Sequence, residues 1–440
     1  MCRSYCVLML VLGVLFLTPA AADDYEVWLV DQSNTLGVSH GGALYIYDGH
    51  ALTRDAAAAE PVDRIDFSAE TSILCLAATG ANPVRPHMLT FNSTETHAVL
   101  SFVVSGHVVI YDARSRTPVA CFRTEVGAGG QRQAHAAWPT GDDRFILVAN
   151  QNGKKLERIR TNYGRNEYSQ EPAATLDLAN CTTPNGLPCQ AAGLRPDTAP
   201  ICPFTASNNG PAFVSLRGGG LFVVNWRTTP MSIVSEYDLD NVPANGCGFI
   251  EAKGWIYANG GGGTAANLDQ FTVYRVSMHG HRAGGPPNQP TVQVLFNDDA
   301  HERDAHGVAV TRNERFVWIG DRDANLAEVF DSWSGSHAGT VNLVSSLSAD
   351  PTPDLFAISP DKRWLFVSTR GPNPLTGDPH SSTGQDPGVL VIRLREGGAT
   401  GEVRGLARIT NIDALGIERA DAHGIRIRCA DPVPAGDGAT

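Results

Sequence analysis

Short apolar runs separated by turn residues recur along the chain, and long amphipathic helical stretches are absent from the sequence. Three segments, which begin at His135, His306 and Asp354, follow one pattern. Each has a polar opening residue, a short apolar run, a turn, an arginine and an aromatic residue ten positions after the opening. Short apolar runs bounded by turns are typical of antiparallel strands. Each segment therefore predicts two strands joined by a hairpin.

The pattern recurs often enough to predict a propeller. A divergent copy begins at His87. His87 lies 48 residues before the opening residue His135, and the same spacing of 48 residues separates His306 from Asp354. Weaker copies lie at 211–224 and 247–258, and further apolar runs supply a third and a fourth strand. Four antiparallel strands in a unit of about 40–50 residues are typical of a propeller blade. The units open near 87, 135, 211, 247, 306 and 354.

The two ends of the chain predict one more blade. Residues 423–428 resemble an innermost strand with no blade after it, while 26–31 and 43–48 resemble a second and a third strand with no first strand before them. One blade built from both ends closes the ring and removes exposed sheet edges. The sequence therefore predicts an all-β fold, a seven-bladed β-propeller of four-stranded antiparallel blades, in a single domain over 23–440.

The first 22 residues predict a secretory signal peptide. Arg3 gives a positive start, 6–17 is an unbroken apolar run of 12 residues, and Ala20–Ala22 supplies the small residues of a cleavage site. A run of 12 residues is too short to cross a bilayer, and no later stretch reaches 18 apolar residues. We therefore expect an exported protein, periplasmic or extracellular, without a membrane span.

Export changes the interpretation of the cysteines, because cysteines of exported proteins are commonly paired as disulfides. Cys181, Cys189 and Cys202 lie in one proline-rich segment. We expect a disulfide between two of them, and the sequence leaves the pairing open. The chain has no CxxCH haem-attachment motif, no paired CxxC zinc pattern and no phosphate-binding loop. We therefore expect neither haem nor nucleotide as a cofactor.

Two segments carry a resemblance to known propellers. Ser359–Val367 and Thr140–Asn150 resemble the repeats of YVTN-type and lactonase-like seven-bladed propellers, and His306–Val310 resembles the blade openings of NHL-type propellers. The resemblance implies the seven-bladed fold over nearly the whole chain after the signal peptide. Propellers of these kinds include binding proteins, lyases and lactonases. Function must therefore be argued from the site, because the fold does not determine it.

The opening residues predict a shared site. In a propeller, the chain begins each blade near the axis on one face, here called the top. Opening residues from five consecutive blades are therefore expected around one channel: His306, Asp354, His423, His87 and His135. Imidazole nitrogen and carboxylate oxygen are ligands for copper, zinc and iron. The sequence predicts a metal site in this group, with copper preferred over zinc or another divalent metal, and Cys247 as a further candidate to face it.

Two carboxylates lie at equal distances before two of the predicted ligands. Asp304 precedes His306 by two positions, and Asp421 precedes His423 by two positions. A carboxylate commonly holds the second ring nitrogen of a ligand histidine, so we expect Asp304 and Asp421 in this role. The alternative for all of these residues is structural, because a polar residue before an inner strand often bonds to the neighbouring blade.

Three functions remain open from the sequence. The first is metal-dependent oxidoreduction of a small molecule. The second is a non-catalytic scaffold that binds a protein, a peptide or a cell-envelope component over the top face, where loops 68–86, 180–208 and 370–387 are long. The third, less favoured, is a metal-assisted lyase or lactonase. A net charge of -12 without any basic run argues against a nucleic-acid partner.

Overall fold

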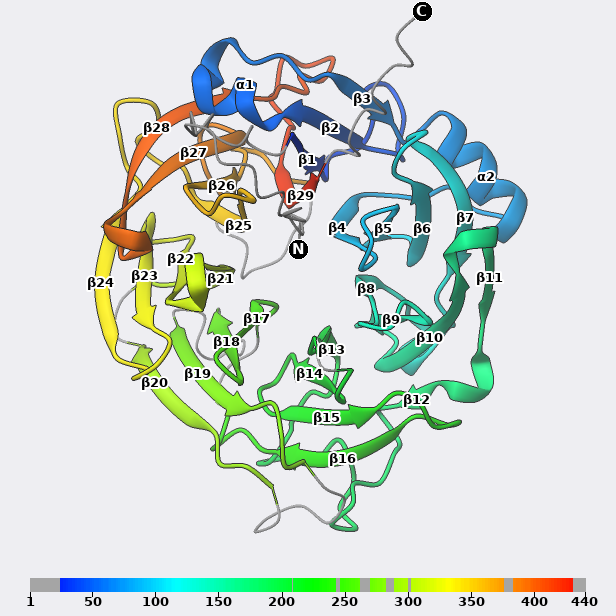
Figure 1. Cartoon of the computed structure of the whole chain (residues 1–440). Helices are drawn as coiled ribbons and strands as arrows, with labels where there is room; N and C mark the ends of the chain where they lie inside the picture. The colour runs from blue at the N-terminus through cyan, green and yellow to red at the C-terminus, as the bar shows by residue number, and fades with distance from the viewer. Residues whose placement is uncertain are drawn as a thin grey trace, which may run out of the picture.

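Seven antiparallel sheets stand around one axis, each beginning with a strand next to the centre (Figure 1). The computed structural model describes residues 24–207, 209–242, 246–261, 270–281, 289–299, 302–375 and 383–429. The arrangement confirms the predicted seven-bladed propeller of four-stranded antiparallel blades. The predicted signal peptide over 1–22 lies outside the described residues.

The first blade is shared by both ends of the chain, as predicted. Its strands, from the axis outward, are β29 (Ala422–Cys429), β1 (Tyr25–Asp31), β2 (Ala43–Asp48) and β3 (Asp63–Asp66). β1 and β29 pair antiparallel, with Tyr25 opposite Cys429 and Leu29 opposite Ile425. This pairing gives the first blade its fourth strand and closes the ring between the first and the last segments of the chain.

The next three blades follow in chain order. The second blade has β4 (Pro86–Phe91), β5 (His97–Phe102), β6 (His107–Asp112) and β7 (Thr117–Arg123). The third has β8 (Ala134–Pro139), β9 (Phe145–Asn150), β10 (Lys155–Asn162) and β11 (Glu167–Gln170), with β12 (Leu176–Asp177) also paired to β10. The fourth has β13 (Pro200–Thr205), β14 (Ala212–Leu216), β15 (Leu221–Asn225) and β16 (Ser232–Tyr237).

Three further blades complete the ring. The fifth has β17 (Phe249–Ala252), β18 (Trp255–Gly261), β19 (Phe271–Ser277) and β20 (Gln293–Asp298). The sixth has β21 (Ala305–Val310), β22 (Phe316–Asp321), β23 (Leu326–Asp331) and β24 (His337–Asn342). The seventh has β25 (Pro353–Ile358), β26 (Trp364–Thr369), β27 (Gly388–Arg395) and β28 (Thr400–Arg408).

The predicted opening of the fourth blade near residue 211 is wrong. Its innermost strand is β13, and the segment at 211–224 holds the second and third strands. β13 contains Pro200 and Pro203, residues that disfavour strands, and follows the cysteine-rich segment, so its sequence resembles a loop. The pairing of β13 with β14 shifts register between these two prolines, which lets the strand continue past them.

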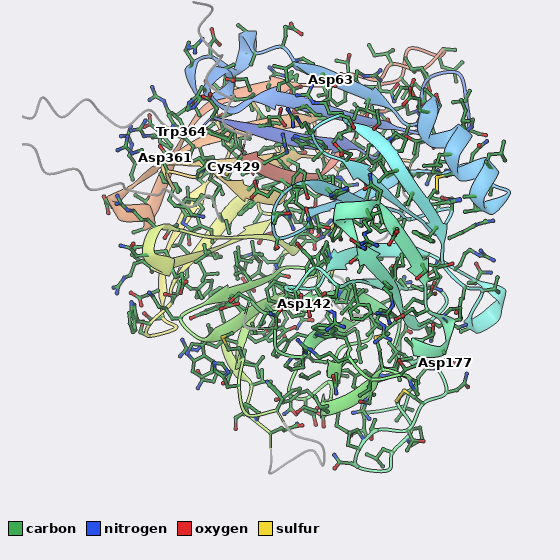
Figure 2. The ribbon with its side chains drawn as sticks, turned by 45° about the vertical axis from the view of Figure 1, so that its right-hand side comes forward. Asp63, Asp142, Asp177, Asp361, Trp364 and Cys429 are labelled. Atoms are coloured by element: carbon green, nitrogen blue, oxygen red, sulfur yellow. A yellow bond between two sulfur atoms is a disulfide. The ribbon has the colours of Figure 1, made fainter. Side chains whose placement is uncertain are left out.

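Side chains crowd the interior of the ring between the sheets (Figure 2). The hydrophobic ones form the core, in which Trp28, Trp226 and Trp318 are fully buried. Two helices, α1 (Gly49–Arg54) and α2 (Glu70–Thr79), lie outside the sheets in the described part of the chain. Neither they nor any other helix among the described residues is long and apolar enough to cross a membrane.

Among the residues that the structure describes, three disulfides join pairs of cysteines, one within a loop and two that tie other segments to the blades. Cys181 pairs with Cys189, which confirms the predicted bridge in the proline-rich segment. Cys75 of α2 pairs with Cys121 of β7, and Cys202 of β13 pairs with Cys247. Three bridges are typical of a protein that folds in an oxidising compartment.

Candidate functional site

The opening residue of an inner strand lies in a β-bulge at the top of the channel. In β4, β21, β25 and β29, two residues that include the opening residue face a single residue of the next strand. In β8, His135 is itself the extra residue between Ala134 and Ala136. A bulge bends the strand and turns the side chain away from its normal alternation. This local geometry explains how opening residues reach the channel instead of the packed space between blades.

Hydrogen bonds from neighbouring blades hold the bulged backbone in place. Ser101 Oγ in β5 donates to the carbonyl oxygen of His135 in the following blade at 2.9 Å. Ser368 Oγ in β26 donates in the same way to the carbonyl oxygen of His423 at 2.7 Å. Each serine belongs to the second strand of the preceding blade, so every such bond fixes one opening residue relative to its neighbour.

The structure brings four predicted histidines together along one side of the channel, in the order His135, His87, His423, His306; we call these the histidine arc. The rings of His135 and His87 have centroids 4.6 Å apart. His87 stacks on His423 at 3.9 Å with an interplanar angle of 12°, and His423 lies 5.4 Å from His306. All four line a cavity of about 80 Å³ at the top of the channel. The predicted convergence of these imidazoles is therefore present.

The hydrogen bonds of His87 and His135 determine which ring nitrogens carry protons. His87 Nδ1 donates to Gln32 Oε1 at 2.8 Å, and Gln32 Nε2 donates to Asp421 Oδ2 at 2.8 Å, which sets the orientation of the amide. His135 Nδ1 donates to the carbonyl oxygen of Ile201 at 3.0 Å. A neutral imidazole has one N–H, so the Nε2 atom of each ring carries a lone pair. These two Nε2 atoms lie 3.4 Å apart.

Asp354 sets the same tautomer in the other two rings of the arc. His306 Nδ1 donates to Asp354 Oδ1 at 2.8 Å, and His423 Nδ1 donates to Asp354 Oδ2. The Nε2 atom of each ring is therefore the lone-pair nitrogen. His423 Nε2 is buried and has no hydrogen-bond partner among the described residues.

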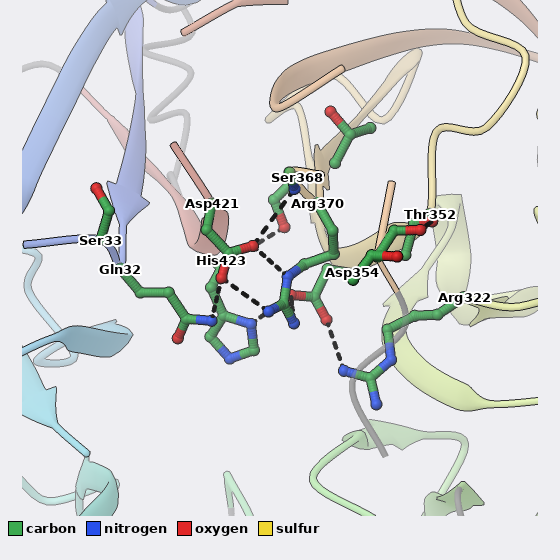
Figure 3. Close-up of polar contacts among 12 residues, drawn as sticks. Gln32, Ser33, Arg322, Thr352, Asp354, Ser368, Arg370, Asp421 and His423 are labelled. Atoms are coloured by element: carbon green, nitrogen blue, oxygen red, sulfur yellow. Dashed lines mark hydrogen bonds and ion pairs between the residues drawn. The ribbon is translucent and has the colours of Figure 1, made fainter. Parts of the chain in front are cut away.

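Asp354 sits at the centre of a buried ionic network (Figure 3). Arg322 Nη1 lies 3.4 Å from Asp354 Oδ1, and Arg370 Nη1 lies 3.3 Å from Asp354 Oδ2. Burial raises the pKa of Asp354, but His423, His306 and Arg370 outweigh burial and hold that pKa well below its usual value. Both oxygens of the carboxylate face protein donors. The structure thus places Asp354 behind two histidines and does not place it among the residues that line the cavity.

The two predicted supporting carboxylates bind arginines. Asp421 accepts hydrogen bonds from Arg370 Nε at 2.6 Å and Arg370 Nη2 at 2.8 Å, besides the one from Gln32. Asp304 accepts a hydrogen bond from Arg322 Nε at 2.6 Å. The carboxylate bonded to both His306 and His423 is Asp354.

Sequence reasoning missed Gln32, Arg322 and Arg370. A second regular spacing could have revealed the two arginines. Arg322 follows His306 by 16 residues, and Arg370 follows Asp354 by 16 residues. Sixteen residues cover the first strand, the hairpin turn and the second strand of a blade. The chain therefore comes back to the top of the channel, and the arginine at that position lies beside the opening residue.

Burial makes the protonated form of two rings unfavourable. It lowers the pKa of His87, and the neighbouring His423 and His135 lower it further, to well below the usual value. Burial also lowers the pKa of His423, although Asp354 acts in the opposite direction. Both rings are therefore neutral near pH 7 and carry lone pairs that can bind a cation.

A second group of ligand atoms lies beside the arc. Among the described residues, His135, Cys202 and Cys247 form the one group of three His, Cys, Asp or Glu residues whose ligand atoms all lie within 4.8 Å of one another. The two sulfurs are bonded to each other as a disulfide, so they are not thiolates. Cys247 lines the same cavity as the histidine arc, as predicted, but as half of this bridge and not as a thiolate. In the histidine arc, the Nε2 atoms of His87 and His135 lie within 3.4 Å of each other.

The fold and this site together define a seven-bladed propeller with a buried histidine cluster at the top of its channel. It resembles a protein from Lactobacillus plantarum at 11% identity and a TM-score of 0.60, covering 92% of this chain and 99% of that chain. It resembles the periplasmic gluconolactonase of Pseudomonas aeruginosa at 13% identity and a TM-score of 0.57, over 92% of this chain and all of that one (100%).

A third similar structure is a putative 6-phosphogluconolactonase from Bacteroides uniformis, at 11% identity and a TM-score of 0.56, over 92% of this chain and 100% of that one. No family model matches the sequence, and no curated protein matches it. The chain is thus a seven-bladed propeller that resembles lactonase-like bacterial propellers at low identity. At such identities the likeness shows the fold alone.

Proposed function

We propose that the protein binds a transition-metal ion between His87 and His135, at the top of the propeller channel, and uses it in chemistry on a small molecule. One observation carries the proposal: two imidazole nitrogens that both bear lone pairs lie 3.4 Å apart. Two lone pairs at this distance repel each other, and a cation between the two nitrogens, a proton or a metal ion, removes that repulsion. Burial and neighbouring imidazoles hold the pKa of His87 well below its usual value, which disfavours a proton on that ring.

The surroundings of the two rings support a metal rather than a purely structural role. Each ring donates its other nitrogen to a fixed acceptor, Gln32 for His87 and a backbone carbonyl for His135. Such acceptors orient ligand histidines in metal proteins and make the coordinating nitrogen more basic. His423 lies next along the arc, and its Nε2 is buried with no partner among the described residues. His423 is therefore the ring placed to join the ion after a small movement.

Copper is the ion that we propose. Imidazole nitrogen suits copper, zinc, iron and nickel, and Cu²⁺ binds most tightly of the divalent first-row ions at such donors. The cavity of about 80 Å³ leaves room for only a few water-sized groups beside the ion. A small substrate that reaches the ion from the top fits these dimensions. The alternative is a non-catalytic scaffold that binds no metal, and it predicts that the purified protein contains no stoichiometric metal.

Lactone hydrolysis is the second candidate, and one contact favours it. His423 Nδ1 donates to the buried carboxylate of Asp354, which leaves Nε2 as a base. A histidine held by a buried carboxylate is a common arrangement for general-base catalysis. Two similar structures carry names of gluconolactonases. Hydrolysis of gluconolactone by metal-stripped protein supports this candidate, whereas activity that needs added metal supports the first one.

The test of the first proposal measures metal in protein produced by export. Elemental analysis is expected to give close to one copper per chain, and titration of stripped protein with Cu²⁺ followed by calorimetry is expected to give a single tight site. His87→Gln and His135→Gln should each weaken binding by about tenfold to a hundredfold. His97→Gln is the matched control, since His97 is also buried and bonds to Asn166 and Thr96 outside the channel. Absence of binding, or equal binding by all three variants, refutes the proposal.

A further inference from the structure

The lower half of the channel holds a second cavity, at the ends of the inner strands opposite the histidine arc. Two neighbouring spaces of about 340 and 350 Å³ share five lining residues, so they form one continuous cavity. The shared residues are Trp138, Phe204, Phe249, Arg426 and Ile427. The space of about 350 Å³, here called the upper space, extends to Met88 and Leu355. These residues directly follow His87 and Asp354 in their strands. This cavity, which we call the lower channel, is therefore large enough for an organic molecule.

Three aromatic rings from consecutive blades build one wall of the lower channel. Trp138 of β8 meets Phe204 of β13 edge to face, with centroids 5.7 Å apart. Phe204 stacks on Phe249 of β17 at 5.9 Å with an interplanar angle of 17°. Aromatic walls of this kind bind apolar and aromatic ligand surfaces.

Arg426 of β29 supplies a positive charge to the lower channel. It is partly exposed there, and its Nη1 donates to the carbonyl oxygen of the adjacent Ile425 at 3.2 Å. Burial lowers its pKa to about 10, and burial is the sole cause of that shift. A guanidinium carries five N–H donors, so most of its donors remain for a ligand. An ionised group in such a place is strongly stabilised by an anion.

The lower channel contains three further polar side chains besides Arg426 that bear on its preference for a ligand. Lys362 lines the upper space, and burial lowers its pKa. Trp138 Nε1 is buried and has no hydrogen-bond partner among the described residues, and an unmade hydrogen bond at a buried donor is costly. Among the described residues that line the lower opening, Glu95 is the one carboxylate, and its Oε2 accepts a hydrogen bond from the backbone of Cys429 at 2.7 Å. Arg426, Lys362 and Trp138 thus offer donors to a ligand in the lower channel.

We propose that the lower channel binds an organic anion whose carboxylate pairs with Arg426 and whose apolar or aromatic body lies against Trp138, Phe204 and Phe249. The unpartnered N–H of Trp138 is a second donor for such a ligand. The proposal is independent of the metal, because the residues that carry it belong to the opposite half of the channel. It assigns two different sites to the two ends of one propeller axis.

The probe for this site is 1-naphthoate, compared with the neutral 1-naphthamide by calorimetry on the mature protein. The expected result is saturable binding of 1-naphthoate and binding of the amide that is weaker by at least about tenfold. Arg426→Gln should weaken 1-naphthoate binding by about tenfold to a hundredfold, and Trp138→Phe by several-fold. Arg404→Gln is the matched control, since Arg404 is exposed on β28 and pairs with Glu402.

Two substitutions distinguish the lower channel from the metal site at the top of the channel. His87→Gln should leave 1-naphthoate binding unchanged, and Arg426→Gln should leave copper binding unchanged. If Arg426→Gln fails to fold, as judged by circular dichroism, Arg426→Lys replaces it and should retain part of the affinity. Equal affinity for acid and amide, absence of saturable binding, or full affinity in Arg426→Gln overturns the proposal.

Discussion

The Nε2 atoms of His87 and His135 lie 3.4 Å apart, although the remaining nitrogen of each ring already donates a hydrogen bond elsewhere. The two rings come from neighbouring blades whose openings are 48 residues apart in sequence. Their approach is imposed by bulges in β4 and β8 and by the bond from Ser101 to the His135 carbonyl. The scaffold thus holds two imidazole nitrogens close together, and the proposed metal ion would lie between them.

Gln32 is expected to act on the metal through His87. Gln32→Leu removes the acceptor of His87 Nδ1, so the ring is free to turn or to change its tautomer. We expect copper affinity to fall by about tenfold to a hundredfold. Calorimetric titration of stripped protein measures this change, and rescue by Gln32→Asn or Gln32→Glu would separate positioning from simple loss of packing. Unchanged affinity in Gln32→Leu would show that the ring needs no such support.

Asp354 is expected to matter for stability as well as for the site. Asp354→Asn removes the charge that faces Arg322 and Arg370 and leaves two buried guanidinium groups with fewer partners. Loss of one member of a buried ionic network costs about 3–5 kcal/mol of the free energy of unfolding. Urea denaturation at pH 7 measures the change, with the loop substitution Asp361→Asn as the control. A loss below about 1 kcal/mol would contradict the central role of this carboxylate.

The Cys202–Cys247 bridge distinguishes the histidine arc from the neighbouring group of ligand atoms. The bridge joins residues 45 positions apart, so the variant with both cysteines changed to alanine should lose about 2–4 kcal/mol of stability. We expect that variant to retain copper, because the arc remains intact. If oxidised protein binds no metal and reduction by dithiothreitol creates a site that this variant lacks, His135 with two thiolates is the true site instead.

His107 is expected to produce a pH dependence of stability outside the candidate site. Burial lowers its pKa to about 4, with Arg123 and Arg132 acting in the same direction. In the unfolded chain the ring titrates near pH 6.5, so the unfolded state binds more protons between these values. Stability is therefore complete above about pH 6.5 and should fall by about 2–4 kcal/mol as the pH drops toward 4.

The His107→Gln variant isolates this contribution. Its unfolding free energy should depend less on pH between 6.5 and 4 than that of the unchanged protein, whereas His40→Gln should follow the unchanged protein. Urea denaturation at several pH values measures both curves. Parallel curves for all three proteins would mean that His107 does not cause the loss.

The recurring pattern of polar opening residue, apolar run and late aromatic residue was enough to predict the ring and the meeting of the histidines. It could not predict the opening of the fourth blade, because Pro200 and Pro203 made β13 resemble a loop. The pattern also predicted Asp354 as a metal ligand. Its actual position follows from contacts with Arg322 and Arg370 across neighbouring blades, and such contacts are set by packing that a single sequence does not display.

The most direct test is X-ray absorption at the copper edge of copper-loaded protein. The account predicts nitrogen neighbours at about 2.0 Å with the outer-shell signature of at least two imidazoles. It also predicts loss of that signature in His87→Gln and in His135→Gln, and its retention in His97→Gln. Sulfur neighbours, or an imidazole signature that survives both channel substitutions, would contradict a metal ion held between His87 and His135.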